Sequence, residues 1–278
     1  LDSCMNNKLL CLNSQWQGCE SEILAHGSRK LAAELFGKKP YLHMQIDKSK
    51  DEIPLNSVYA MDVIEEDLIN SLDLLKKNTP EKILTAGATC GTQLAPISYL
   101  NELYDGEVAV VWFDAHGDLN TPSSSPSGHF HGMVLRTLLG DGPNELRKII
   151  KLPLLHRQVY MAGIRDLDMC EEQYISNTDI NVGRVDESLA DMILEAGFKK
   201  VYIHIDVDVL NPDDFKDMLM PTKGGPNRAQ LTASLSSLCK KLEIVGVGVV
   251  EYCGIVDESS LEIKNLLKDA AILDIFDI

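Results

Sequence analysis

Two short runs of acidic residues, each following an apolar segment, are the features of this chain best suited to carry out chemistry. They read Val110-Val111-Trp112-Phe113-Asp114-Ala115-His116-Gly117-Asp118 and Val201-Tyr202-Ile203-His204-Ile205-Asp206-Val207-Asp208. Because alternate side chains of an extended segment point to the same side, Asp114, His116 and Asp118 share one side, as do Asp206 and Asp208. Carboxylates gathered in this way repel one another unless cations lie between them. The spacing therefore predicts a metal site, and the number of donors indicates two ions.

The donor types indicate which metal and which reaction. Hard carboxylate oxygens suit Mn²⁺ better than softer metals. Two divalent ions that share a water lower its pKa enough to supply hydroxide near pH 7, which is the chemistry of hydrolysis. A solvated turn is the alternative interpretation of the first run, and the second Asp-x-Asp run argues against it. His204 lies inside the second apolar segment, where we expect a core or supporting histidine rather than a ligand.

Composition limits the possible partners. The chain has 278 residues, with 26 basic against 42 acidic side chains and a formal charge of −16. Such a surface repels nucleic acid and anionic lipid, so we expect neither as a partner. No apolar stretch approaches the roughly 18 residues that span a bilayer, and no signal peptide is evident. The seven cysteines lack CxxC spacing, which favours a reduced, cytoplasmic setting over a disulfide framework; they are Cys4, Cys11, Cys19, Cys90, Cys170, Cys239 and Cys253.

Apolar segments and helical periodicity alternate along the chain. This alternation predicts a single α/β domain over residues 1–278, with a parallel sheet covered by helices on both faces. Expected strands are Leu9–Leu12, Lys82–Ala86, Glu107–Phe113, Gln158–Ala162, Lys200–Ile205 and Ile244–Val250. Expected helices are Glu20–Phe36, Asp62–Lys77, Leu94–Tyr104, Gly132–Leu139, Glu187–Ala196, Leu231–Leu242 and Ser259–Asp274. In such sheets the carboxyl ends of the strands carry the ligand site, and the polar clusters fall there.

The sequences at these strand ends resemble the arginase, or ureohydrolase, family. The resemblance is carried by Asp114-Ala115-His116-Gly117-Asp118-Leu119-Asn120-Thr121-Pro122, by Ser127-Gly128-His129-Phe130-His131-Gly132 and by Asp206-Val207-Asp208-Val209-Leu210-Asn211-Pro212. Gly163-Ile164-Arg165-Asp166-Leu167-Asp168 and Glu251 follow in the expected order, so the resemblance runs from about Ile83 to Glu251. It implies a three-layer α/β/α fold, two manganese ions and hydrolysis of a guanidino group to urea or a substituted urea.

The resemblance also implies roles for individual residues. Asp114 and Asp206 would bridge the ions, His116 and Asp208 would hold one, and Asp118 the other. Glu251 would pair with the guanidinium and His131 would handle protons for the departing amine, so that these two and Asp118 form the catalytic set. The positions that would bind the amino-acid end of a substrate are Asn120, Ser125, Ser127, His129 and Asp168. The loop from Asp118 to His131 matches the arginase spacing without a gap, which favours an amino acid over a decarboxylated amine as the substrate.

Two positions depart from the family pattern. Where the family reads Gly-Gly-Asp-His, with His as a metal ligand, this chain reads Gly87-Ala88-Thr89-Cys90. A thiolate is softer than imidazole and reaches less far from the backbone, so we expect the Cys90 ion to be weakly held. This cysteine, together with Trp16-Gln17-Gly18, resembles the branch that hydrolyses Nω-hydroxyarginine. His129 stands where arginases commonly have Asn. Packing without ligation is the alternative for Cys90, since free cysteines are often buried.

Three functions from different classes follow. The first is Mn²⁺-dependent hydrolysis of arginine or Nω-hydroxyarginine to urea or hydroxyurea and ornithine. The second is hydrolysis of another C–N substrate on the same fold, such as guanidinobutyrate, agmatine or formimidoylglutamate. The third is a non-catalytic metal-binding relative, against which the retained aspartates and histidines argue. Many arginases assemble through a C-terminal extension; we expect this chain to be without one and to form a monomer or a small homo-oligomer.

Overall fold

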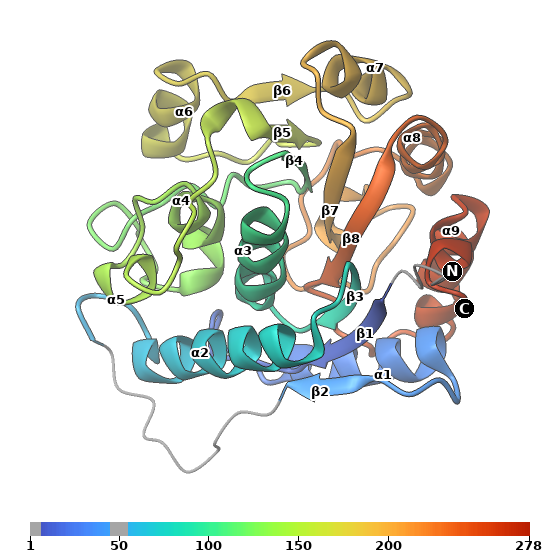
Figure 1. Cartoon of the computed structure of the whole chain (residues 1–278), viewed down its shortest axis with the longest axis horizontal. Coiled ribbons are helices and arrows are strands. Elements are labelled where there is room, and N and C mark those ends of the chain that lie inside the picture. The colour runs from blue at the N-terminus through green and yellow to red at the C-terminus, as the bar shows by residue number, and fades with distance from the viewer. Residues whose placement is uncertain (1–6, 45–54) are drawn as a thin grey trace, which may run out of the picture.

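A parallel sheet forms the centre of the molecule. The computed structural model describes residues 7–44 and 55–278, and Cys4 lies outside this part. Among the described residues the sheet has eight strands in the order β2-β1-β3-β8-β7-β4-β5-β6, and every neighbouring pair is parallel (Figure 1). The strands are β1 Lys8–Asn13, β2 Leu42–Met44, β3 Lys82–Gly87, β4 Val108–Phe113, β5 Val159–Ala162, β6 Asn181–Gly183, β7 Lys200–Asp206 and β8 Glu243–Val250.

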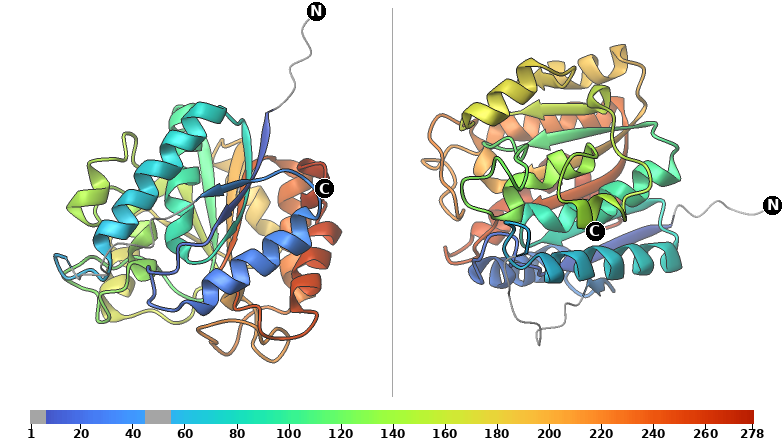
Figure 2. Two further views of the ribbon diagram at one scale, coloured as in Figure 1. Left: turned by 90° about the horizontal axis from the view of Figure 1, so that it is seen from below. Right: turned by 90° about the vertical axis from the view of Figure 1, so that its left-hand side faces the viewer.

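Helices cover both faces of the sheet, which gives the expected three-layer α/β/α fold (Figure 2). One apolar core joins the sheet to α1 Ile23–Phe36, α7 Ser188–Glu195, α8 Arg228–Lys241, α9 Ser259–Asp269 and α10 Ile272–Ile275. The other joins it to α2 Met61–Asn78, α3 Leu94–Leu103, α4 Val134–Leu138, α5 Asn144–Arg147 and α6 Met169–Ser176. Short 3₁₀ turns η1 Cys90–Gln93, η2 Phe130–Met133, η3 His156–Gln158 and η4 Val207–Val209 complete the described elements. No described helix is long and apolar enough to cross a membrane.

The central strands are buried on both faces, as their uninterrupted apolar sequences predict. Along β4 the side chains alternate, so that Val111 and Phe113 enter the first core while Val110 and Trp112 enter the second. All the expected strands and long helices are present, with ends that differ by a few residues. The expected helix Gly132–Leu139 is instead η2 followed by α4, and Ser259–Asp274 is broken where Ala271 adopts φ 64°.

The loops at the carboxyl ends of β3, β4, β7 and β8 meet at one edge of the sheet. Gly163 follows β5 there with φ 97°, and a Cβ at this position would lie 2.4 Å from Val209 Cγ2 and 3.1 Å from the Asp114 carbonyl oxygen. Only glycine therefore lets the chain after β5 pass this close to both acidic runs. The close approach brings the segments that carry the expected ligands together.

Candidate metal centre

The run after β4 is ordered by its own backbone. Asp114 is fully buried; its Oδ1 accepts a hydrogen bond from the His116 backbone N–H at 2.6 Å, and its Oδ2 accepts one from Trp112 Nε1 at 3.2 Å. The run ends at Asp118, a buried non-glycine residue with φ 52°. Such left-handed backbone is costly and is concentrated at functional sites. The strain turns the chain away from β4 and leaves both carboxylates at the sheet edge.

The run after β7 lies directly beside it. Asp208 Oδ1 accepts from the Ala115 N–H at 3.1 Å, and Asp208 Oδ2 lies 3.0 Å from His116 Nδ1. Asp206 Oδ1 accepts from the Asp208 N–H at 2.8 Å. Arg165 holds the following turn, because its guanidinium donates to the carbonyl oxygens of Asp208 at 2.9 Å and of Val209 at 3.1 Å. The structure thus brings Asp114, His116 and Asp208 together, with ligand atoms within 4.8 Å of one another.

Cys90, at the end of β3, lies inside the same cluster. Its Sγ is 3.2 Å from Asp206 Oδ2, and its backbone N–H donates to Glu251 Oε1 at 3.1 Å. Glu251 follows β8 with φ 61°, and its backbone N–H bonds to the Ala88 carbonyl oxygen at 2.9 Å. Donor atoms of Cys90, Asp206 and Glu251 lie within 4.8 Å of one another, as do those of Cys90, Asp114, Asp118 and His204. The Cys90 thiol therefore faces carboxylates as well as the apolar core.

Electrostatics and unpaired atoms both fit a cation here. Burial, followed by repulsion between neighbouring carboxylates, raises the pKa of Asp118 and Asp206 well above their usual range and that of Asp208 to about 6. Burial also raises the pKa of the Cys90 thiol. Among the described residues, Asp118 Oδ2 and Glu251 Oε2 are buried with no hydrogen-bond partner. Buried polar atoms left unpaired are rare and costly, and bound cations would supply what these acids lack.

Two histidines that line the cavity side of the cluster, His116 and His131, respond to their acidic neighbours. Burial alone would lower the pKa of His116, but its hydrogen bonds and charge interactions with Asp114 and Asp208 raise it to about 12. Burial would likewise lower the pKa of His131, yet Glu251, whose Oε1 is 3.4 Å from His131 Nδ1, raises it. His131 is thus placed to carry a proton beside a carboxylate.

A cavity of about 250 Å³ opens onto this cluster. It contains most of the site residues that the sequence predicts, namely Cys90, His116, Asp118, Asn120, Ser125, Ser127, His131, Asp206, Asp208 and Glu251. Asp168 does not line it but accepts a hydrogen bond from Asn120 Nδ2 at 2.6 Å. His129 does not line it either: its Nε2 lies 2.8 Å from Glu20 Oε2. The structure therefore pairs His129 with an acid outside the cavity.

Glu171 lines the cavity and was missed from the sequence. It is 5% exposed, and its carboxylate accepts from the backbone N–H groups of Leu119 and Asp168, both at 3.1 Å. It thereby fixes the chain beside Asp118 to the start of α6. The sequence feature that could have identified Glu171 is the Asp168-x-x-Glu171 spacing of a helix capping box. In the structure, Asp168 Oδ1 accepts from the Glu171 N–H at 3.0 Å.

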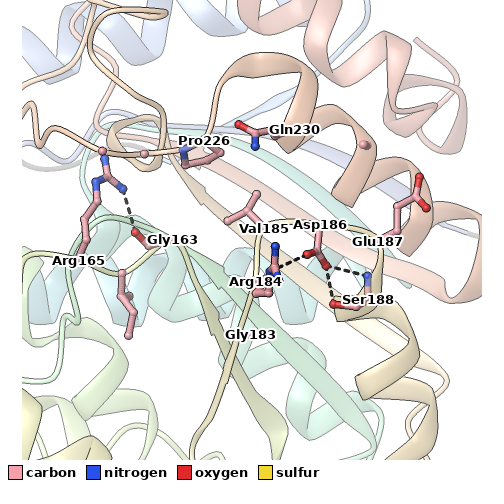
Figure 3. Close-up of a pocket in the computed structure, with 14 residues that line it drawn as sticks. Gly163, Arg165, Gly183, Arg184, Val185, Asp186, Glu187, Ser188, Pro226 and Gln230 are labelled. Atoms are coloured by element: carbon pink, nitrogen blue, oxygen red, sulfur yellow. Dashed lines mark hydrogen bonds and ion pairs between the residues drawn. The ribbon is translucent and has the colours of Figure 1, made fainter.

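A larger cavity of about 810 Å³ lies beyond β5 and β6 (Figure 3). Of the two acids that line it, Asp186 and Glu187, Asp186 is already engaged by the Ser188 N–H at 2.9 Å and by Arg184 Nε at 3.0 Å. Arg165 forms part of its wall while donating to backbone carbonyls, including that of Gly163 at 2.9 Å. No histidine or cysteine is among its lining residues. The smaller cavity is therefore the candidate active site.

Comparison with known proteins agrees with the strand-end motifs. The model of the Arginase family matches residues 79–273. The chain belongs to the arginase family. The arginase of Staphylococcus aureus strain MRSA252 is 28% identical over 188 residues, which cover 64% of this chain and 62% of that protein. The arginase of Plasmodium berghei is 29% identical over 266 residues, which cover 86% of this chain and 72% of that protein.

A solved arginase has the same fold as this family member. The Entamoeba histolytica arginase, in complex with L-ornithine, superposes with a TM-score of 0.83 at 22% identity, covering 96% of this chain and 98% of that one. The matched segment spans less than two thirds of the S. aureus relative. The predicted family and fold are confirmed.

Proposed function

We propose that this chain hydrolyses the guanidino group of an amino acid, arginine or Nω-hydroxyarginine, to urea or hydroxyurea and ornithine, using two Mn²⁺ ions. The observation that carries this proposal is the cavity whose floor holds buried carboxylates and whose wall holds Glu251 and His131. Glu251 would be the anionic partner of a guanidinium, and His131 would carry a proton to the departing nitrogen. A cytoplasmic location remains part of this proposal.

The proposed bridging roles of Asp114 and Asp206 are supported by the neighbours of their carboxylate oxygens, because the two oxygens of each side chain face different groups. Asp114 Oδ1 faces His116, whereas its Oδ2 faces Trp112 and His204. Asp206 Oδ1 faces the Asp208 backbone, whereas its Oδ2 faces Cys90. We assign His116 and Asp208 to one ion, and Asp118 and Cys90 to the other. When bound, the two ions would make a hydroxide-strength nucleophile available near neutral pH.

Glu251 would position the guanidinium. Its Oε1 is engaged by the Cys90 N–H, while the buried Oε2 has no hydrogen-bond partner among the described residues. A planar guanidinium offers the N–H groups that such an oxygen accepts. His131 lies beside this carboxylate, which favours its protonated form, so it would donate a proton to the departing amine.

The polar wall would bind the substrate's carboxylate. Ser125 Oγ accepts from the Gly128 N–H at 3.0 Å, and Ser127 Oγ accepts from the His129 N–H at 3.2 Å. Because each hydroxyl oxygen accepts from backbone, its own proton is available to donate to an anion. Asn120 is held by Asp168 and by Ser124, whose Oγ donates to Asn120 Oδ1 at 2.7 Å. A substrate without a carboxylate would lack the hydrogen bonds that these groups donate.

The test is a substrate panel with Mn²⁺-loaded protein. Release of urea or hydroxyurea is measured for arginine, Nω-hydroxyarginine, agmatine and guanidinobutyrate, and release of formamide and glutamate is measured for formimidoylglutamate. We expect kcat/KM for agmatine to be about a hundredfold below that for the better amino acid, because agmatine lacks the carboxylate and hydrogen bonds to a charged group contribute roughly 1.5–3 kcal/mol. Ser127→Ala should narrow this gap, whereas Ser123→Ala, in the same loop, should leave it unchanged. Faster turnover of agmatine, or of formimidoylglutamate, would refute the substrate assignment. Tight Mn²⁺ binding without turnover of any substrate would instead support the non-catalytic alternative.

A further inference from the structure

His204 is a buried histidine that the proposed ligand set does not use. It lies in β7, is 0% exposed, and stacks on Trp112 with ring centroids 3.5 Å apart and planes 7° apart. The register of β4 and β7 pairs these two residues directly, and that of β7 and β8 pairs His204 with Gly248. A Cβ at Gly248 would lie 1.5 Å from Gln93 Oε1, so the space above that glycine is filled by Gln93. The strands β8, β7 and β4 are neighbours in the sheet (Figure 1), and their packing fixes the orientation of the imidazole.

Neither ring nitrogen of His204 has a hydrogen-bond partner within the described part of the chain. The nearest acidic oxygen, Asp114 Oδ2, lies 3.8 Å from Nε2, too far for a direct hydrogen bond. A core histidine usually satisfies at least one nitrogen with a carbonyl, a carboxylate or a water. Packing alone accounts for the ring's position but not for its unpaired nitrogens.

The surroundings of His204 are those of a cation ligand. Donor atoms of Cys90, Asp114, Asp118 and His204 lie within 4.8 Å of one another, and all four residues are buried. Two atoms bonded to one ion at about 2.0–2.3 Å lie at most about twice that length apart, so the spacing of these donors is of the size that a shared cation requires. The Asp114 oxygen that faces His204 is Oδ2, on the side away from His116. His204 and His116 thus lie on opposite sides of a shared carboxylate.

We propose that His204 is the imidazole ligand of the ion on the Cys90 side, which gives each of the two ions one histidine. This side then has a donor set of Cys90, Asp114, Asp118 and His204, with Asp206 Oδ2 beside the thiol. The inference rests on the proposed function only in that both require a bound cation. It replaces the expectation of a purely supporting histidine. A mixed thiolate, imidazole and carboxylate set also admits Co²⁺ or Zn²⁺ at this half of the centre.

The experiment measures metal binding rather than turnover. Wild type, His204→Phe and His116→Phe are loaded with Mn²⁺; metal content, affinity and nitrogen coupling to Mn²⁺ are then measured by metal analysis, calorimetry and pulsed EPR. Phenylalanine keeps a flat ring against Trp112 and removes both nitrogens. His156→Phe is the matched control, because His156 also contacts an aromatic ring, that of Tyr174, but lies outside the cluster.

We expect directly bonded nitrogen at both ions of the wild type, and weakening of one ion by about tenfold or more in H204F. H156F should match the wild type. A folded H204F that binds two ions with unchanged affinity and nitrogen coupling would overturn the inference. If H204F does not fold, H116F decides: a directly bonded nitrogen that remains supports His204, and none overturns it. Wild-type protein that binds no Mn²⁺ would overturn both this inference and the proposed function.

Discussion

Replacing Asp67 by Asn should make the metal-free protein more stable, and increasingly so as the pH rises. Asp67 lies in α2, is 6% exposed, and accepts hydrogen bonds from Asn13 Nδ2 at 3.1 Å on both of its oxygens. Burial, only partly offset by Asn13 and Ser71, raises its pKa from 3.8 to about 6. The folded protein therefore binds the Asp67 proton more tightly than the unfolded chain does.

The sign and size follow from this shift. A carboxyl whose pKa is raised on folding lowers the free energy of unfolding progressively as pH rises from its unfolded to its folded pKa. A shift of about two units corresponds to about 3 kcal/mol, which is reached above the folded pKa of about 6. Roughly half of that loss develops between pH 5 and pH 8. D67N has no such proton, so its advantage over wild type should grow by about 1.5 kcal/mol across this interval.

Urea unfolding of wild type and D67N at pH 5 and pH 8, without metal, gives the difference in their free energies of unfolding at each pH, and hence its change between the two. Asp73→Asn is the control, because Asp73 is an exposed acid on the same helix. We expect its difference from wild type to be the same at both pH values. If the D67N difference also stays constant, Asp67 is not the source of this pH dependence. Asp67 also holds Asn13, whose Oδ1 accepts from the Gln15 N–H at 3.0 Å, and Thr89, beside Cys90, donates to Gln15. The activity of D67N should show whether these hydrogen bonds still hold the chain next to Cys90.

Two further predictions concern the centre itself. Asp206→Ala should abolish activity because it removes the carboxylate proposed to bridge the ions. Asp213→Ala, which changes an exposed acid in the next loop, should leave activity unchanged. D206A turnover within about tenfold of wild type would show that the bridging role is misassigned. Wild type should bind its two Mn²⁺ ions with unequal affinity, and Cys90→His should tighten the weaker one and shift the kcat/KM ratio from Nω-hydroxyarginine toward arginine. An unchanged ratio and affinity in metal titration and kinetics would mean that Cys90 only fills space.

The sequence predicts the main strands and helices because burial leaves simple patterns. The strands β3, β4, β7 and β8 are largely apolar and almost fully buried, since helices cover both of their faces. The edge strands β2 and β6 were missed because each has only three residues and little burial. Helix α6 was missed for a related reason: Glu171 is its only buried residue, so it has no apolar stripe. Helix α8 begins three residues before the expected start because Asn227 caps it.

The clustering of candidate ligands could be predicted where they are neighbours in sequence, and less well where they meet across strands. The period-two spacing of Asp114, His116 and Asp118 is visible in one run, and its clustering with Asp208 followed from motif order. The contact of Trp112 with His204 depends on the pairing of β4 with β7, which no local pattern encodes. The same holds for Cys90, whose distance from Asp206 follows from the path of the chain after β3.

The two halves of the proposed centre would differ in chemistry for reasons that lie in the sheet order. One half would be built from the turns after β4 and β7, where His116 and Asp208 lie 3.0 Å apart and would supply an imidazole nitrogen and a hard carboxylate oxygen. The other is built where β3 meets these turns, and it contains a thiol whose pKa burial raises, so a proton must leave before that sulfur binds an ion. A softer donor reduces the charge that its ion presents to substrate. Nω-Hydroxyarginine has a less basic guanidine than arginine and needs less polarisation, so we expect the uneven centre to favour it as the faster substrate.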